Sequence, residues 1–148
     1  MVIEMKKLDY AAIQKIIPHR DPMLLVSTVE ELEPGKRIVA TFYVNPEREI
    51  FKGHFPEEPV LPGVYSVESM AQAACILLLS TERYAGKVPL LIEINRAKFF
   101  QKVFPGDTIE IRATLTKDRP EVAITTCTAK IYNHGRMTAS AEVTLAMR

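Results

Sequence analysis

The 148-residue chain shows two different hydrophobic patterns. Over 109–115 and 139–147, apolar and polar residues alternate one by one, which predicts half-buried strands with one face against a core. Between Val64 and Leu79 the apolar residues instead surround most of a helical cylinder, which predicts a helix buried on nearly all sides. We therefore expect an antiparallel sheet wrapped around one long central helix.

Turn and capping signals predict the remaining elements. Asp9 is a suitable N-cap for a short helix over 10–17, which Pro18 ends and which covers one edge of the sheet. Arg83 and Gly86 are expected in the last turn of the long helix and just past it. Strands are expected over 24–32, 37–44, 90–100, 109–116, 122–132 and 138–147. The chain 1–148 is thus predicted to be a single α+β domain with a six-stranded antiparallel sheet.

Composition narrows the class of protein. Hydrophobic residues make up 47% of the chain and charged residues 25%, and the net charge of +1 gives no sign of a nucleic-acid or membrane partner. Cys75 and Cys127 form no Cys-x-x-Cys pair and are expected to be buried free thiols of a reducing compartment. The first ten residues contain no apolar run of the kind a secretory signal needs, so we expect a cytoplasmic protein.

The candidate chemistry lies at the start of the long helix. Prolines at 56, 59 and 62 stiffen the preceding loop, which carries His54, a side chain that titrates near neutrality. Glu68 interrupts the apolar helix, and a carboxyl group that burial keeps protonated suits a proton donor. Gln72 lies four residues on, where it is expected to hydrogen-bond Glu68 and hold its orientation. Backbone N–H groups at Gly63 and Val64 are placed to stabilise an oxyanion.

The other histidines receive different interpretations. His19 and Arg20 follow Pro18, and we favour a loop whose polar groups are satisfied locally over a lining of the pocket. His134 stands in Asn-His-Gly, a strong hairpin signal, which gives it little catalytic promise. The three histidines have no metal-ligand spacing, so neither a metal nor another cofactor is predicted.

Three segments resemble a known enzyme family. GHFPEEPVLPGVYSVESMAQA, from Gly53, is similar to the signature of the 3-hydroxyacyl-acyl carrier protein dehydratases of the FabZ type. LDYAAIQKIIPHRDPMLLVSTVEELEPGKRIVA resembles the opening of that family, and VFPGDTIEIRATL resembles its later hairpin. The related dehydratase-isomerase type carries Asp at the helix position, so Glu68 favours the simple dehydratase.

This resemblance implies a fold, a reaction and a site. The fold would be the hot-dog fold, and the reaction would convert (3R)-3-hydroxyacyl thioesters on acyl carrier protein into trans-2-enoyl thioesters, in fatty acid synthesis or a dedicated lipid or polyketide pathway. The catalytic pair would be His54 and Glu68, in sites shared by a homodimer, with three dimers forming a hexamer in the family. Phe55, Gly63, Val64 and Gln72 are expected beside the substrate.

The chain also contains a basic cluster, and two rival functions stay open. Arg96, Lys98 and Lys102 are interleaved with phenylalanines, and they form either a solvated strand face or a rim that attracts the family's acidic carrier protein. One rival is a thioesterase of the same fold, in which a helix carboxylate activates water. The other is a non-catalytic module that binds acyl chains or docks a carrier.

Overall fold

The computed structural model describes residues 6–148. Within them, six strands form one antiparallel sheet in the order β1-β2-β4-β5-β6-β3. The elements in chain order are α1 (Tyr10–Gln14), β1 (Thr28–Glu33), β2 (Arg37–Tyr43), η1 (Glu49–Lys52), α2 (Gly63–Leu79), β3 (Pro89–Phe99), β4 (Thr108–Arg119), β5 (Ile124–Asn133) and β6 (Arg136–Met147). The predicted architecture is confirmed.

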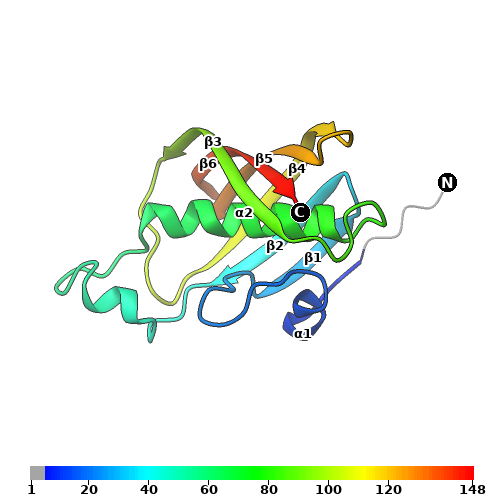
Figure 1. Ribbon diagram of the computed structural model, residues 1–148. Coiled ribbons are helices and arrows are strands. Elements are labelled where there is room, and N and C mark those ends of the chain that lie inside the picture. Colours follow the sequence, from blue (N-terminus) through cyan, green and yellow to red (C-terminus); the bar gives the residue numbers. More distant parts are fainter. Residues whose placement is uncertain (1–5) are drawn as a thin grey trace.

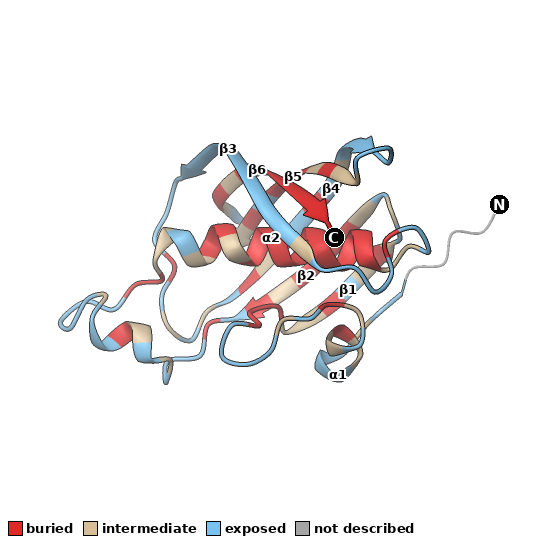
Figure 2. Cartoon of the chain, viewed as in Figure 1, coloured by how far each residue is buried: buried red, intermediate tan, exposed pale blue. Residues whose placement is uncertain are grey.

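The long helix α2 forms the centre of the core. It contacts β2, β3, β4, β5 and β6, and β3 crosses it diagonally in the view of Figure 1. Figure 2 shows α2 buried along most of its length, as the apolar pattern predicted. The inward faces of β4, β5 and β6 close the core with side chains such as Ile111, Ile131 and Val143, all fully buried. Burying such side chains is the main source of stability for a domain of this size.

The long helix ends earlier than predicted. We expected Arg83 in its last turn, but α2 stops at Leu79. The hydroxyls of Ser80 and Thr81 donate to the carbonyls of Leu77 and Leu78, at 2.9 and 2.6 Å, and so satisfy acceptors that the end of a helix leaves unpaired. Arg83 lies beyond the helix and pairs with Asp118, at 2.8 Å.

The first predicted strand also begins too early in the sequence. Residues 24–27 are not part of the sheet, although Leu24, Leu25 and Val26 are buried and their aliphatic run suggested a strand. The backbone N–H of Leu25 donates instead to the side chain of Gln72, at 2.8 Å, and β1 starts only at Thr28. A long-range contact therefore replaces the pairing that the local pattern favoured.

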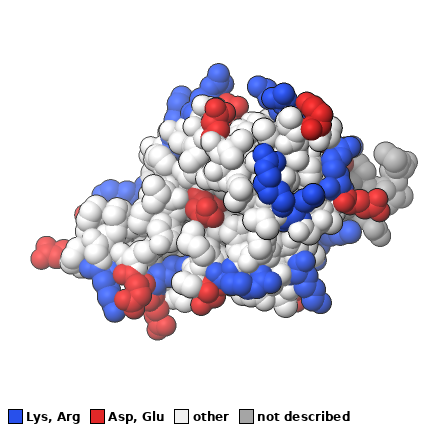
Figure 3. Space-filling model, in the orientation of Figure 1, with Lys and Arg blue, Asp and Glu red and all other residues white. Residues whose placement is uncertain are grey.

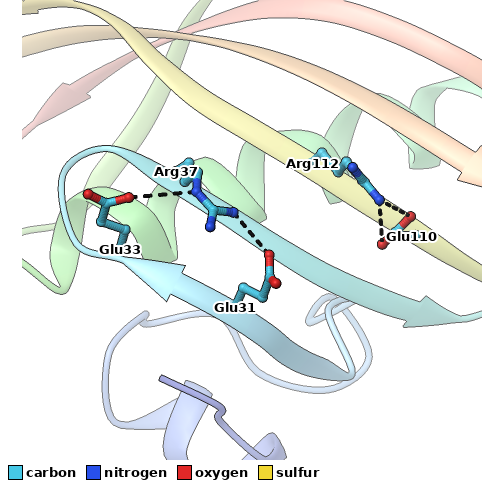
Figure 4. A network of polar contacts seen from close by, with 5 residues as sticks. All are labelled: Glu31, Glu33, Arg37, Glu110 and Arg112. Atoms are coloured by element: carbon cyan, nitrogen blue, oxygen red, sulfur yellow. Dashed lines mark hydrogen bonds and ion pairs between the residues drawn. The ribbon is translucent and has the colours of Figure 1, made fainter. Parts of the chain in front are cut away.

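The two edges of the sheet differ. At the β1 edge, residues 6–8 exchange backbone hydrogen bonds with Val29 and Leu32, and α1 lies close by. Figure 4 shows Arg37 on β2 bridging Glu31 and Glu33 on β1, at 3.0 and 3.6 Å. At the other edge, all of β3 after Pro89 is exposed, and no other segment within 6–148 pairs with its outer side. The short helix was expected over 10–17 and to cover one edge; α1 ends at Gln14 and packs near β1, but residues 6–8 make the backbone bonds to this edge.

Candidate active site

His54 lies in a loop that extends past the start of α2. The segment 45–60 is mostly exposed and lies at one end of the molecule in Figure 1. The His54 N–H donates to the Ile50 carbonyl and the His54 carbonyl accepts from Val60, both at 3.0 Å, so the backbone is fixed on both sides of the imidazole. The peptide bond between His54 and Phe55 is cis, and the two rings stack with centroids 4.1 Å apart.

The hydrogen bond of the His54 ring determines which nitrogen is available as a base. Nδ1 lies 2.9 Å from the carbonyl oxygen of Val60. A carbonyl only accepts, so the neutral ring carries its proton on Nδ1 and leaves a lone pair on Nε2. His54 is thus held in the tautomer that a general base attacking through Nε2 requires.

Glu68 lies on α2, and Gln72 holds its carboxylate. The Gln72 amide donates from Nε2 to Oε2 of Glu68, at 2.8 Å, which confirms the predicted hydrogen bond. The same amide donates to the Met23 carbonyl and accepts from the Leu25 N–H, both at 2.8 Å. Gln72 is fully buried, so it lies behind the carboxylate and binds protein groups on every side. Glu68 itself is only half-buried, with 25% of its side chain exposed.

His19 is the site neighbour that sequence reasoning missed. We expected its polar groups to be satisfied locally, but its Nε2 lies 4.0 Å from Oε2 of Glu68 and its buried Nδ1 has no hydrogen-bond partner. Burial lowers the pKa of His19, Glu68 acts to raise it, and Arg20 acts to lower it further. The contact joins residues 49 positions apart, which no local pattern shows. The Pro-His-Arg segment was the available signal.

The expectation for Arg20 is confirmed. Its guanidinium donates to the carbonyls of Gln14, Ile17 and His19, at 2.8, 2.9 and 2.6 Å. These bonds brace the turn that follows α1. Arg20 therefore supports the loop that carries His19.

The start of α2 borders a cavity of about 410 Å³. Gly63 has little space beside it, because a methyl group there would lie 3.0 Å from Cε1 of Phe99. Val64 is 71% exposed and Phe55 is 53% exposed, so the single chain leaves both open to a ligand or partner. The cavity is lined by Val60, Leu61, Gly63, Ser66, Phe99, Phe100, Gln101, Lys102, Val103 and Thr138.

The three predicted docking cations do not share one surface. Arg96 and Lys98 border a separate depression of about 440 Å³, together with Lys117 and Lys130. Lys102 lines the cavity beside Gly63 and pairs with Glu58, at 2.8 Å. Arg96 lies 3.8 Å from the carboxylate of Glu142.

His54 and Glu68 are not joined within one chain. Among the described residues, neither a hydrogen bond nor an ion pair links the two side chains. The structure of one chain therefore shows each half of the predicted pair with its own support.

Several other predictions concern residues away from the site. Cys75 and Cys127 are buried free thiols as expected, and burial raises the pKa of Cys127 to about 12. His134 lies in the turn between β5 and β6, as predicted. Over 6–148, no cluster of three or more His, Cys, Asp or Glu side chains could hold a metal ion, and no helix there is long and apolar enough to cross a membrane.

Comparisons with known proteins agree with this description. A model of FabA-like domains matches residues 17–142. The chain is 45% identical to a 3-hydroxyacyl-[acyl-carrier-protein] dehydratase FabZ of Lactobacillus helveticus, over 95% of this chain and 93% of the relative. It is 44% identical to the protein of the same name from Clostridium tetani, over 94% and 96%.

A solved structure supports the fold independently. The dehydratase heterocomplex ApeI:P from Xenorhabdus doucetiae superposes with a TM-score of 0.74 at 16% identity, covering 92% of this chain and 90% of that one. At this identity the likeness concerns the hot-dog fold alone. The sequence matches, which span nearly the whole of both proteins, show the family. The chain belongs to the 3-hydroxyacyl-[acyl-carrier-protein] dehydratases of the FabZ type.

Proposed function

We propose that the protein removes water from (3R)-3-hydroxyacyl chains on acyl carrier protein, giving trans-2-enoyl thioesters for fatty acid synthesis. It is thus a hydro-lyase. Membership of the FabZ family supports the reaction. The observation that carries the assignment to residues is the pair of supported groups, a base with a free Nε2 on His54 and a carboxyl group on Glu68 held by Gln72.

The mechanism uses these groups as base and acid. The thioester carbonyl accepts a hydrogen bond from the N–H at Gly63, which makes the C2 proton more acidic. His54 removes that proton through Nε2, and Glu68 gives a proton to the C3 hydroxyl as the C–O bond breaks. A double bond forms between C2 and C3 and water leaves, so the step needs no oxidant or reductant. Phe55 and Val64 are both exposed in the single chain, Phe55 next to His54 and Val64 next to Gly63, and would contact the acyl chain.

We propose that two chains pair through β3. This edge strand exposes Leu90, Leu91, Ile92 and Ile94, an unusual set for a sheet edge facing water. In Figure 3, uncharged atoms cover much of the face that β3 crosses, with one acidic side chain near its centre and a group of Lys and Arg to the right of it. Pairing two β3 edges would continue the sheet across a two-fold axis and bring His54 of one chain toward Glu68 of the other. Such dimers would then form a hexamer, as in the family.

The partner and the compartment follow from the same proposal. Lys102 beside the cavity is the best placed of the three cations to attract an acidic carrier at the entrance, with Arg96 and Lys98 extending the positive field. The buried, unpaired thiols of Cys75 and Cys127 support a reducing cytoplasm.

The reaction is tested by incubating the protein with a panel of carrier-bound 3-hydroxyacyl chains and recording loss of water by mass spectrometry. We expect dehydration of wild type, and a fall in turnover of about 10² to 10⁴ for His54→Ala and for Glu68→Gln. His134→Ala, in an exposed turn, and Glu110→Gln, at a partly exposed position of β4, are matched controls and should keep full turnover. Release of free thiol without dehydration would indicate the thioesterase rival, and binding without either reaction would indicate the non-catalytic module.

Mixing the two inactive variants tests the shared site. In a mixed dimer, one site contains both wild-type residues and the other contains both substitutions. Equal mixing with random pairing should therefore restore about a quarter of wild-type turnover if the two residues come from different chains. A site within a single chain predicts no recovery at any ratio.

A further inference from the structure

We propose that His19 is a positioning residue that directs the proton of Glu68 toward the substrate. This proposal rests on the proposed function, in which Glu68 is the acid. It assigns a role to a half-buried side chain whose placement is not explained by the hydrogen bonds of its own loop. The Pro-His-Arg loop would then be a working part of the site.

Two nitrogen atoms lie toward the same oxygen of the Glu68 carboxyl group, and one of them donates a hydrogen bond to it. Gln72 donates to Oε2 at 2.8 Å, and His19 Nε2 faces the same Oε2 at 4.0 Å. An oxygen that already accepts from an N–H group is a poor place for an acidic proton. The proton of the neutral acid is therefore favoured on Oε1, the oxygen that neither nitrogen faces. That is the oxygen left to reach a hydroxyl group of the substrate.

The surroundings of the His19 ring favour one tautomer. Nδ1 is buried and has no hydrogen-bond partner, so a proton placed there would be an unsatisfied buried donor, which is costly. A proton on Nε2 instead points at the carboxylate and stabilises it after proton transfer. At 4.0 Å the two atoms are too far apart for a hydrogen bond, so the Nε2–H of His19 acts on the carboxylate of Glu68 through electrostatic attraction.

The role proposed for His19 also requires that its ring is uncharged. A permanent cation at this position would hold Glu68 ionised and remove its ability to give a proton. Burial lowers the pKa of His19, which keeps the ring uncharged at neutral pH. Arg20 also lowers the pKa of His19, and Cys75 is a nearby buried thiol on the same helix whose pKa is raised by burial and by Glu68. In the proposed dimer, His54 of the second chain would also face Glu68.

The test compares two substitutions in the wild-type background. His19→Gln places an amide N–H near the position of Nε2, whereas His19→Phe keeps the ring shape and removes the donor. We expect His19→Phe to lower kcat by up to about 10²-fold with little change in KM, because a misdirected acid slows the proton-transfer step. In His19→Phe, the alkaline limb of the pH profile of kcat should move to higher pH, because the ionised form of Glu68 loses the N–H that stabilises it. His19→Gln should recover most of kcat and keep the wild-type profile.

Controls separate this proposal from a packing role. His134→Gln, in the exposed turn, should leave both kcat and the pH profile unchanged. Thermal unfolding of each variant identifies any loss of the fold. Equal losses in His19→Gln and His19→Phe with an unchanged pH profile would mean that the ring only packs the loop, and would overturn the proposal.

A measurement without substrate keeps the two proposals distinguishable. Heteronuclear NMR of the histidine side chains in wild type should show His19 protonated on Nε2, and Glu68→Gln should shift that resonance. A proton on Nδ1 in wild type would overturn the inference, whatever the enzyme assay shows. A wild type that dehydrates no substrate, with the Nε2 tautomer present, would instead count against the proposed function.

Discussion

The two edges of the sheet differ in whether another segment of the chain covers them. At β1, residues 6–8 take up backbone groups of the strand, and Arg37 crosses to two glutamates on β1. At β3, the backbone edge is open and aliphatic side chains face outward. Natural proteins block edges that must not pair, commonly with charges and covering segments. The contrast indicates that β1 is closed to partners, and it supports β3 as the edge through which two chains join.

The largest expected effect is at β3. Ile92→Arg places a charge in the middle of the proposed interface, where it would be buried without a partner. We expect dimers to become monomers, and turnover to fall by at least about 10²-fold because each site would lose the residue supplied by the other chain. Size-exclusion chromatography with light scattering measures the first effect, and the dehydration assay measures the second.

The matched control for this variant is at the opposite edge. Glu30→Arg changes an exposed residue of β1 and should alter neither mass nor turnover. A dimer that survives Ile92→Arg, or one that is lost in Glu30→Arg, would reverse the assignment of the two edges.

An intermediate effect is expected where α2 begins beside the end of β3. In Gly63→Ala the new methyl group would contact the ring of Phe99, and the displaced ring would disturb the N–H that we propose binds the thioester. We expect turnover to fall by about tenfold or more, as for other small displacements of a positioned group. Adding Phe99→Leu should restore part of the loss. Steady-state kinetics of the two variants check this, and a fully active Gly63→Ala enzyme would contradict it.

The smallest effect is expected at the charged edge. Arg37→Met removes the ion pairs with Glu31 and Glu33. Arg37 and Glu31 keep 42% and 47% of their side chains exposed, so water screens the charges and the free energy of unfolding should fall by only about 1 kcal/mol. Urea denaturation at low and high salt measures this change, and the difference from wild type should shrink as salt rises. Dimer formation should be unaffected.

Local patterns predicted most of the fold and part of the site. The apolar cylinder of α2 and the alternation in β4 and β6 report burial directly, because side-chain direction repeats with the period of each element. The contact of Gln72 with Glu68 was predictable for the same reason, since residues four apart share a helix face.

Long-range contacts account for what the sequence did not show. His19 meets Glu68 only because the loop before β1 folds against α2, and Gln72 fixes that loop by taking the Leu25 N–H. The same bond explains why an aliphatic run from Leu24 is not a strand. The helix α2 ends where the hydroxyls of Ser80 and Thr81 bind its last carbonyls. Hydrophobic periodicity does not show where such bonds form.

The triple anchorage of the Gln72 amide has a consequence for heat inactivation. This one buried side chain joins the carboxyl group of Glu68 to the backbone of Met23 and Leu25, in the segment before β1. That segment cannot detach while the carboxyl group of Glu68 keeps its position. The enzyme should therefore retain its activity up to the cooperative melting transition and lose its activity and its fold together there.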